Sequence, residues 1–246
     1  MLYPLQSDLL TIPHGMFDRN NGASLPPFDS LNVSYSVSDN TIAVTANRQR
    51  IKKVFNISFL LSARQIHSSK IFNARIVEKD NEVDGFDALI TNQKNVGLLI
   101  QQADCQAILM HDPIRNAIAA IHCGWRGSVA NIINTTVLEM HEQYKTDPSH
   151  LNVVISPSLG PCCAEFINYT SELSVRFHPF QEKTNHFNFW DISVMQLEEA
   201  GVKPTHIDVT GICTCCNSNY FSYRRTRKNG RQETGRNCSL ICLPQN

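Results

Sequence analysis

The middle third of the chain contains three short apolar runs separated by polar residues. Residues 96–100, 106–110 and 117–121 are apolar on both faces, a pattern typical of strands buried inside a sheet. The six-residue polar gap 111–116 begins His-Asp-Pro, and proline after aspartate is common at the start of a turn. We therefore predict a β-hairpin over residues 105–122.

Apolar residues at helical spacing follow the predicted hairpin. A helix is predicted over residues 128–144, with Ser128 as its N-cap. Its buried face would consist of apolar residues three or four positions apart, namely Val129, Ile132, Ile133, Val137 and Met140. A second helix is expected over residues 191–200, ended by Gly201 and by Pro204.

Two further apolar runs, at residues 152–156 and 207–212, are expected to be short strands. Strands and helices are thus mixed along the chain, with a hairpin as well as longer connections. This order predicts an α+β (mixed α/β) fold. No repeat or linker divides the sequence, so we expect a single domain over residues 1–246.

Composition and charge narrow the class of partner. The 246 residues are 42% hydrophobic and 18% charged, as in globular proteins. Basic and acidic residues number 22 each, so no basic excess favours nucleic acid or a membrane surface. The N-terminus does not resemble a signal peptide, and no apolar run is long enough to span a bilayer. We expect a cytoplasmic protein that binds a small molecule, and neither nucleic acid nor a membrane.

The predicted hairpin brings two reactive side chains together. A turn centred on the Pro–Ile bond of the gap would place Cys105 opposite His122, with Cα atoms ~4.5–5.5 Å apart. A thiol and an imidazole at that spacing can share a proton or a metal ion. Asp104 precedes the cysteine, and the N–H groups of residues 124–128 would offer a site for phosphate or a developing oxyanion.

The residues alone leave several functions open. Cys105 could be a buried structural cysteine, a nucleophile with His122 as its base in a cysteine hydrolase or deamidase, or a zinc ligand together with His122. His67 is a candidate third ligand, but spacing does not select it from nine histidines. The last alternative is a non-catalytic protein that binds a metal or a partner.

The nine cysteines form an odd number, and without an export signal we expect reduced thiols. Cys162 and Cys163 are adjacent, and adjacent cysteines are not expected to bind one metal together. The Cys-x-Cys-Cys run at residues 213–216 resembles half of a structural zinc site. Its second half could come only from the distant Cys238 and Cys242.

Short motifs occur along the chain from about residue 14 to residue 243. They are His14–Arg19, Gln65–His67, Ala103–Cys105, His122–Gly127, Gly160–Glu165, Phe221–Arg225 and Thr234–Arg236. In this order they resemble the motifs of the YfiH/DUF152 family. That family is labelled multicopper polyphenol oxidase or laccase, and is also described as purine nucleoside phosphorylase. The label makes a copper polyphenol oxidase (laccase) a further alternative, although the chain has no His-x-His pair.

This resemblance implies a CNF1/YfiH-like layered fold, with mixed sheets flanked by helices. It also implies that His67, Cys105 and His122 bind zinc at the catalytic centre, with copper as the alternative metal. The implied activities are phosphorolysis of adenosine, inosine and methylthioadenosine, together with deamination of adenosine. The partners would be purine nucleosides and phosphate, and the protein a monomer or a small homo-oligomer.

Phosphorolysis requires a phosphate site, and arginine suits the bidentate recognition of an oxyanion. We hypothesise that phosphate binds near the backbone of residues 124–128, with help from Arg126 or Arg224. The arginine-rich stretch at residues 223–228 would otherwise be a solvated loop. Trp125 is expected either to be part of the core or to stack on a planar ligand.

Overall fold

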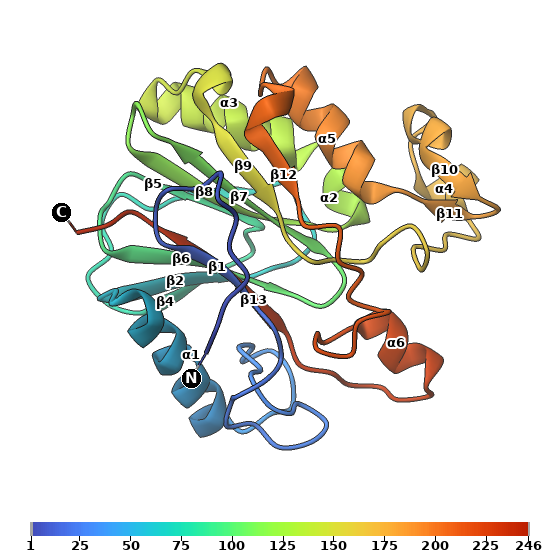
Figure 1. Cartoon of the computed structure of the whole chain (residues 1–246), viewed down its shortest axis with the longest axis horizontal. Helices are drawn as coiled ribbons and strands as arrows, with labels where there is room; N and C mark the ends of the chain where they lie inside the picture. The colour runs from blue at the N-terminus through green and yellow to red at the C-terminus, as the bar shows by residue number, and fades with distance from the viewer. Residues whose placement is uncertain (1, 246) are drawn as a thin grey trace.

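Two β-sheets stack face to face in the computed structural model, which describes residues 2–245 (Figure 1). The strand order is β1-β13-β6-β2-β4 in the first sheet and β12-β9-β7-β8-β5-β3 in the second. The strands of the first sheet are β1 His14–Phe17, β2 Phe59–Arg64, β4 Asn81–Asp84, β6 Val96–Gln102 and β13 Asn237–Cys242. Those of the second are β3 Ile71–Asn73, β5 Ala88–Thr91, β7 Gln106–Asp112, β8 Ala117–Cys123, β9 Asn152–Ile155 and β12 Ile207–Val209.

Helices lie on the outer face of each sheet. The helices of the chain are α1 Thr41–Phe55, α2 Trp125–Val129, α3 Ile132–Tyr144, α4 Tyr169–Glu172, α5 Phe189–Glu199 and α6 Tyr223–Lys228. Helices α3 and α5 pack on the second sheet, and α1 packs on the first (Figure 1). A small lobe holds α4 and the two-stranded sheet of β10 Gln181–Lys183 and β11 His186–Phe187, and it projects from the main body.

The main core lies between the two sheets. Leu61 and Leu98 of the first sheet pack there with Leu109 and Ala120 of the second, and all four are fully or almost fully buried. Because both faces of the central strands are covered, β6, β7 and β8 are buried along their whole length. This explains their continuous apolar runs and confirms the predicted strands and the mixed α/β class.

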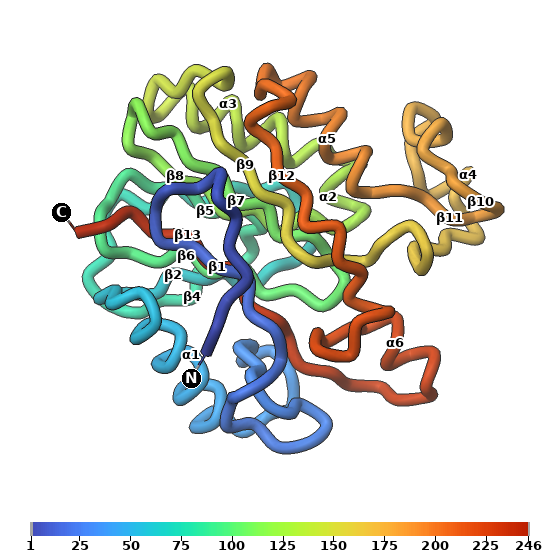
Figure 2. The backbone as a smooth tube through the Cα atoms, in the orientation of Figure 1, coloured from blue at the N-terminus to red at the C-terminus, as the bar shows by residue number. Residues whose placement is uncertain are grey.

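The two ends of the chain meet in the first sheet. Strand β1 pairs antiparallel with β13, and β13 pairs antiparallel with β6. Figure 2 shows the N-terminal segment running beside the C-terminal strand. None of the helices within residues 2–245 is long and apolar enough to cross a membrane.

Asparagine side chains begin the three longest helices. Asn40, Asn131 and Asn188 each accept hydrogen bonds from backbone N–H groups in the first turn of α1, α3 and α5, respectively. The predicted helix over residues 191–200 is confirmed as α5. It is followed by Gly201 with a φ of +95°, a conformation that glycine adopts without strain.

The predicted single helix over residues 128–144 is wrong at its start. The chain forms the short α2, then breaks at Asn131, which has a φ of +53°, and only then begins α3. Ser128 lies inside α2, where its N–H donates to the Gly124 carbonyl, so it is not an N-cap. Val129 is 42% exposed and does not belong to the buried face of α3. Asparagine tolerates left-handed φ values, which explains why the break falls there.

The predicted hairpin is present, but its register is shifted by two residues. Ala107, rather than Cys105, pairs with His122. Strand β7 continues through His111 and Asp112, so the turn is shorter on its N-terminal side than expected. Asp112 accepts hydrogen bonds from the N–H groups of Ile114 and Arg115, and Asn116 closes the turn at a φ of +52°. A shift of two residues leaves every side chain on its expected face, so the region around His122 still faces Cys105.

Candidate active site

Three predicted residues, His67, Cys105 and His122, come together beside the end of the hairpin. Cys105 lies in the connection between β6 and β7, His122 in β8, and His67 in the turn after β2. Their nearest ligand atoms lie within 4.8 Å of one another. The Cys105 Sγ lies 3.9 Å from His67 Nε2, and the centres of the two imidazole rings are 4.9 Å apart. Two imidazoles and a thiol are a donor set that suits zinc and leaves a fourth position open.

Gly124 provides the space in which the Cys105 sulfur lies. A Cβ atom at this position would be 2.9 Å from Cys105 Sγ and 3.2 Å from His67 Cδ2. The backbone of Gly124 is extended, with a φ of −84°, so any residue could adopt it. Glycine is therefore required here by the close approach of the sulfur and not by backbone conformation.

A buried carboxylate, Asp87, orients two of the three residues. Asp87 Oδ1 accepts a hydrogen bond from His122 Nδ1 at 2.9 Å and another from the His67 backbone N–H at 2.9 Å. Its Oδ2 accepts from the N–H and the hydroxyl of Ser68 at 2.6 and 2.8 Å. With Nδ1 bonded to Asp87, His122 directs Nε2 towards Cys105. Carboxylate–histidine pairs orient metal ligands in this way in many metal sites.

The electrostatics favour an ionised thiol. Burial opposes ionisation of Cys105, but the imidazole of His122 and hydrogen bonds from both histidines lower its pKa to about 6. Burial likewise opposes the charge of His122, while Cys105 and Asp87 raise its pKa to about 9. Hydrogen bonds from His122 and Ser68 outweigh burial and lower the pKa of Asp87 to about 2. Near neutral pH, Cys105 is therefore a thiolate beside an imidazolium, unless a metal ion takes the place of the shared proton.

The neighbouring thiol, Cys123, has the opposite character. It is buried, and its sulfur lies 3.4 Å from the hydroxyl of Ser128. Burial raises the pKa of Cys123 to about 12. Of the two thiols near His122, only Cys105 is thus ionised at neutral pH.

The triad lies at the wall of a cavity of about 480 Å³, a size typical of small-molecule sites. Trp125 is half-buried in this wall and packs edge-on against Phe166, with ring centres 6.2 Å apart. Trp125 is therefore partly a core residue and partly exposed to the cavity. Tyr223, an exposed aromatic residue, lines the cavity as well.

Both predicted phosphate-binding arginines line this cavity. Arg126 is exposed and stacks on the Trp125 ring at 4.1 Å. Arg224 donates from its guanidinium to the Glu165 carbonyl at 3.0 Å. The backbone N–H of Ser128 is used inside α2, so the expected anion site over residues 124–128 loses that donor.

Asp104 positions Arg224. Its carboxylate accepts from the Arg224 backbone N–H at 2.6 Å and from the Thr214 hydroxyl at 2.7 Å. Its own backbone has a φ of +87°. Asp104 thus connects the loop that carries Cys105 to the start of α6, and both of its carboxylate oxygens are occupied.

The sequence analysis does not identify Arg236, Asp87 or the aromatic Phe166, which also lines the cavity. Arg236 lines the cavity, with one guanidinium nitrogen held by the carbonyls of Thr234 and Gly235. The closing motif that contains Arg236 was a signal that could have indicated it. Asp87 stands outside every motif, and only the folded chain shows its contact with His122.

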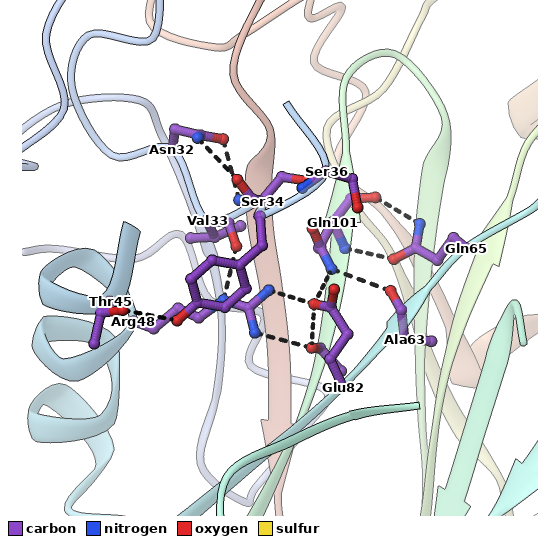
Figure 3. A network of polar contacts seen from close by, with 12 residues as sticks. Asn32, Val33, Ser34, Ser36, Thr45, Arg48, Ala63, Gln65, Glu82 and Gln101 are labelled. Atoms are coloured by element: carbon purple, nitrogen blue, oxygen red, sulfur yellow. Dashed lines mark hydrogen bonds and ion pairs between the residues drawn. The ribbon is translucent and has the colours of Figure 1, made fainter. Parts of the chain in front are cut away.

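A polar network includes two residues of the cavity lining that lie near the triad, Gln65 and Gln101 (Figure 3). The Gln65 side-chain amide donates to the Gln101 carbonyl at 2.7 Å and accepts from the Gln101 backbone N–H at 2.9 Å. Gln101 also donates to Glu82, which forms a 2.6 Å ion pair with Arg48 of α1. The network fixes the strand end that leads into His67.

The two-sheet fold with a His–Cys–His centre defines the class of this protein, a mixed α/β protein with the architecture of YfiH and YlmD. Residues 13–244 match the family model described as multi-copper polyphenol oxidoreductase laccase. The chain belongs to this family, as its motifs predicted.

Named relatives and similar solved structures support the same family assignment. The chain is 27% identical over 251 residues to a protein of Bacillus subtilis named purine nucleoside phosphorylase YlmD, covering 94% of this chain and 88% of that protein. The structure of YlmD from Geobacillus stearothermophilus matches with a TM-score of 0.87 at 26% identity, over 97% of this chain and 94% of that one. The YfiH structure from Bacillus licheniformis matches with a TM-score of 0.83 at 27% identity, over 94% and 92% of the two chains.

Proposed function

We propose that this chain is a zinc-dependent purine nucleoside phosphorylase that acts on adenosine, inosine and methylthioadenosine and also deaminates adenosine. The observation that carries the proposal is the His67–Cys105–His122 group, set beside a cavity that arginine and aromatic side chains line. The names of relatives such as YlmD support the choice of purine nucleosides and phosphate as substrates.

Zinc fits the donor set better than the several coppers of a laccase. Within residues 2–245, two groups of side chains could hold a metal, and only His67–Cys105–His122 contains histidine. When bound, zinc in this donor set supplies a Lewis acid and a water that is activated near neutral pH. Asp87 keeps the His122 ring in place and leaves its Nε2 free as a ligand.

The remaining residues would bind substrate. Trp125 and Phe166 offer aromatic surface for the purine base. Arg126 and Arg224 would hold phosphate, because guanidinium groups pair with two oxyanion oxygens at once. Arg236 adds a third cation on the same cavity.

A second candidate function is a cysteine hydrolase or deamidase, in which Cys105 is the nucleophile and His122 the base. The lowered pKa of Cys105 and the Asp87–His122 hydrogen bond support it, because a nucleophile, a base and an orienting carboxylate are then in contact. This alternative requires activity without metal and rapid alkylation of Cys105 by iodoacetamide. A zinc-bound thiolate would be alkylated slowly until a chelator removes the metal.

Product analysis separates these functions. Purified protein is incubated with adenosine, with and without phosphate, and the products are resolved by chromatography. Adenine and ribose 1-phosphate formed only with phosphate would support phosphorolysis, and inosine would support deamination. No product under either condition would reject both activities and favour the hydrolase.

The phosphate assignment has its own test. Arg126→Gln combined with Arg224→Gln should raise the KM for phosphate at least tenfold and leave the affinity for nucleoside much less affected. Arg115→Gln, in the exposed hairpin turn far from the cavity, is the matched control. An unchanged phosphate KM in the double variant would reject the assignment.

A further inference from the structure

Four cysteines from two distant segments meet outside the active site. Cys162, Cys163, Cys213 and Cys216 have sulfur atoms that all lie within 4.8 Å of one another. Cys216 Sγ lies 3.6 Å from Cys162 Sγ and 3.5 Å from Cys163 Sγ, although 54 and 53 residues separate these positions. All four are free thiols, and the group includes buried and exposed members.

We propose that these four cysteines bind a structural zinc ion, which makes a second metal site independent of His67–Cys105–His122. Zinc–sulfur bonds of ~2.3 Å arranged as a tetrahedron place the sulfur atoms about 3.8 Å apart. The distances from Cys216 Sγ to the sulfur atoms of Cys162 and Cys163 are close to this value. They are too long for a disulfide, whose sulfur atoms are ~2.05 Å apart. The two segments thus complete the zinc site of which residues 213–216 alone looked like half.

The backbone holds both segments in the required shape. Cys163 and Ala164 donate to the Gly160 carbonyl at 2.9 and 3.0 Å, which makes a tight turn around the first cysteine pair. A second turn is closed by the bond from the Asn217 N–H to the Cys213 carbonyl at 2.9 Å. The turns are joined by the short parallel bridge between Ser158 and Cys213. The ligands are therefore largely preorganised.

Local charges suit a zinc ion bound by four thiolates, which would carry a net charge of −2. Backbone N–H groups of Cys216, Gly160 and Cys215 face the Cys213 sulfur and would stabilise negative charge on it. The Lys183 ammonium lies 3.4 Å from the Cys162 carbonyl. Arg225 donates to the carbonyls of Thr214, Cys215 and Asn217 in the second turn.

The site joins two walls of the active-site cavity. Cys162 and Cys163 precede the lobe of α4, β10 and β11, while residues 213–216 precede α6 (Figure 1). Phe166, just after the first pair, and Arg224, in α6, both line the cavity, and Arg224 bonds to the Glu165 carbonyl. Zinc would tie the base of the lobe to the segment that leads into the arginine-bearing helix.

Metal content of a Cys105→Ala variant tests the proposal. This variant lacks the active-site thiol ligand but keeps all four cysteines of the second site. It should retain about one zinc ion per chain, and cobalt in its place should give the intense sulfur-to-cobalt charge-transfer band of four thiolates. A Cys105→Ala protein without zinc, or with cobalt but no such band, would overturn the proposal. The test does not depend on activity, so it can fail while the proposed phosphorylase function stands.

Variants within the second site sharpen the test. Cys216→Ser should lose one zinc ion per chain relative to the unmodified protein, whereas Cys215→Ser is the matched control and should keep it. Cys215 adjoins Cys216 in sequence but is not one of the four. Equal metal content in the two variants would contradict the assignment. If Cys216→Ser does not fold, the metal content of Cys105→Ala still decides between the outcomes. A native disulfide between Cys216 and Cys162 or Cys163 would also exclude zinc at this site.

Discussion

Replacing Gly124 with alanine would move the Cys105 sulfur without replacing any of the three proposed ligands. The new Cβ would lie 2.9 Å from Cys105 Sγ, whereas ordinary contact begins at 3.4 Å, so the sulfur must shift by about 0.5 Å. Metal–ligand distances tolerate about ±0.2 Å. The main chain is not strained by alanine, because Gly124 has an extended backbone. The effect should therefore fall on the metal centre, with affinity for zinc lowered about 10–100-fold, as for other changes beside a ligand.

Zinc affinity measured by competition with a chromogenic chelator is the direct assay, with phosphorolysis rate and melting temperature measured alongside. Gly97→Ala is the control for overpacking, because its Cβ would lie 2.5 Å from Ile57 Cδ1 in the core, far from the triad. The control should lose about 1–3 kcal/mol of stability and keep the zinc affinity of the unmodified protein. Unchanged zinc affinity in Gly124→Ala would refute the view that this glycine makes room for the Cys105 ligand.

Three further changes have predictable outcomes. Asp87→Asn should lower zinc affinity about 10–100-fold in the chelator assay, because His122 loses the carboxylate that orients it. Asp84→Asn, at an exposed position, is the control and should keep the affinity. Equal affinities in the two variants would contradict the orienting role of Asp87. Arg48→Met removes the cation from the Glu82 carboxylate, which keeps hydrogen bonds from Ser62 and Gln101, and should cost about 3 kcal/mol in denaturant unfolding. A loss below about 1 kcal/mol would rule this out. Burial lowers the pKa of His14 below 6.5, so its neutral form stabilises the fold above pH 6.5 and this contribution is lost as the pH falls through the folded value. Unfolding free energies at pH 7.5 and pH 5.5 should thus differ less in His14→Gln, and an equal difference would disprove the assignment.

The hydrophobic pattern of the sequence predicts the strands that build the site better than it predicts which residues pair across the hairpin. The strands of the hairpin are long and apolar because both of their faces are covered, and this periodicity is visible in the sequence. The register depends on Asp112 and on the left-handed Asn116, which only the folded turn reveals. An error of two residues keeps side chains on the same face, so Cys105 still lies beside His122 although the predicted pairing is wrong.

Residues that act through long-range contacts could not be found from spacing. Asp87 reaches His122 from a segment 35 residues away, and no periodicity or motif connects the two. Cys162 and Cys163 were set aside because adjacent cysteines rarely share a metal, yet folding brings them to residues 213–216. The helix expected at Ser128 begins elsewhere because Asn131 tolerates a left-handed φ that helix periodicity does not report.

Phosphorolysis of inosine by the unmodified protein and by Cys105→Ser, compared side by side, decides whether the His67–Cys105–His122 site catalyses the reaction. We expect ribose 1-phosphate and hypoxanthine in equal amounts from the unmodified protein, and a loss of at least a hundredfold in rate for Cys105→Ser. Equal rates in the two proteins would show that the reaction does not use the His67–Cys105–His122 site. No ribose 1-phosphate from the zinc-loaded unmodified protein would contradict the phosphorylase assignment itself.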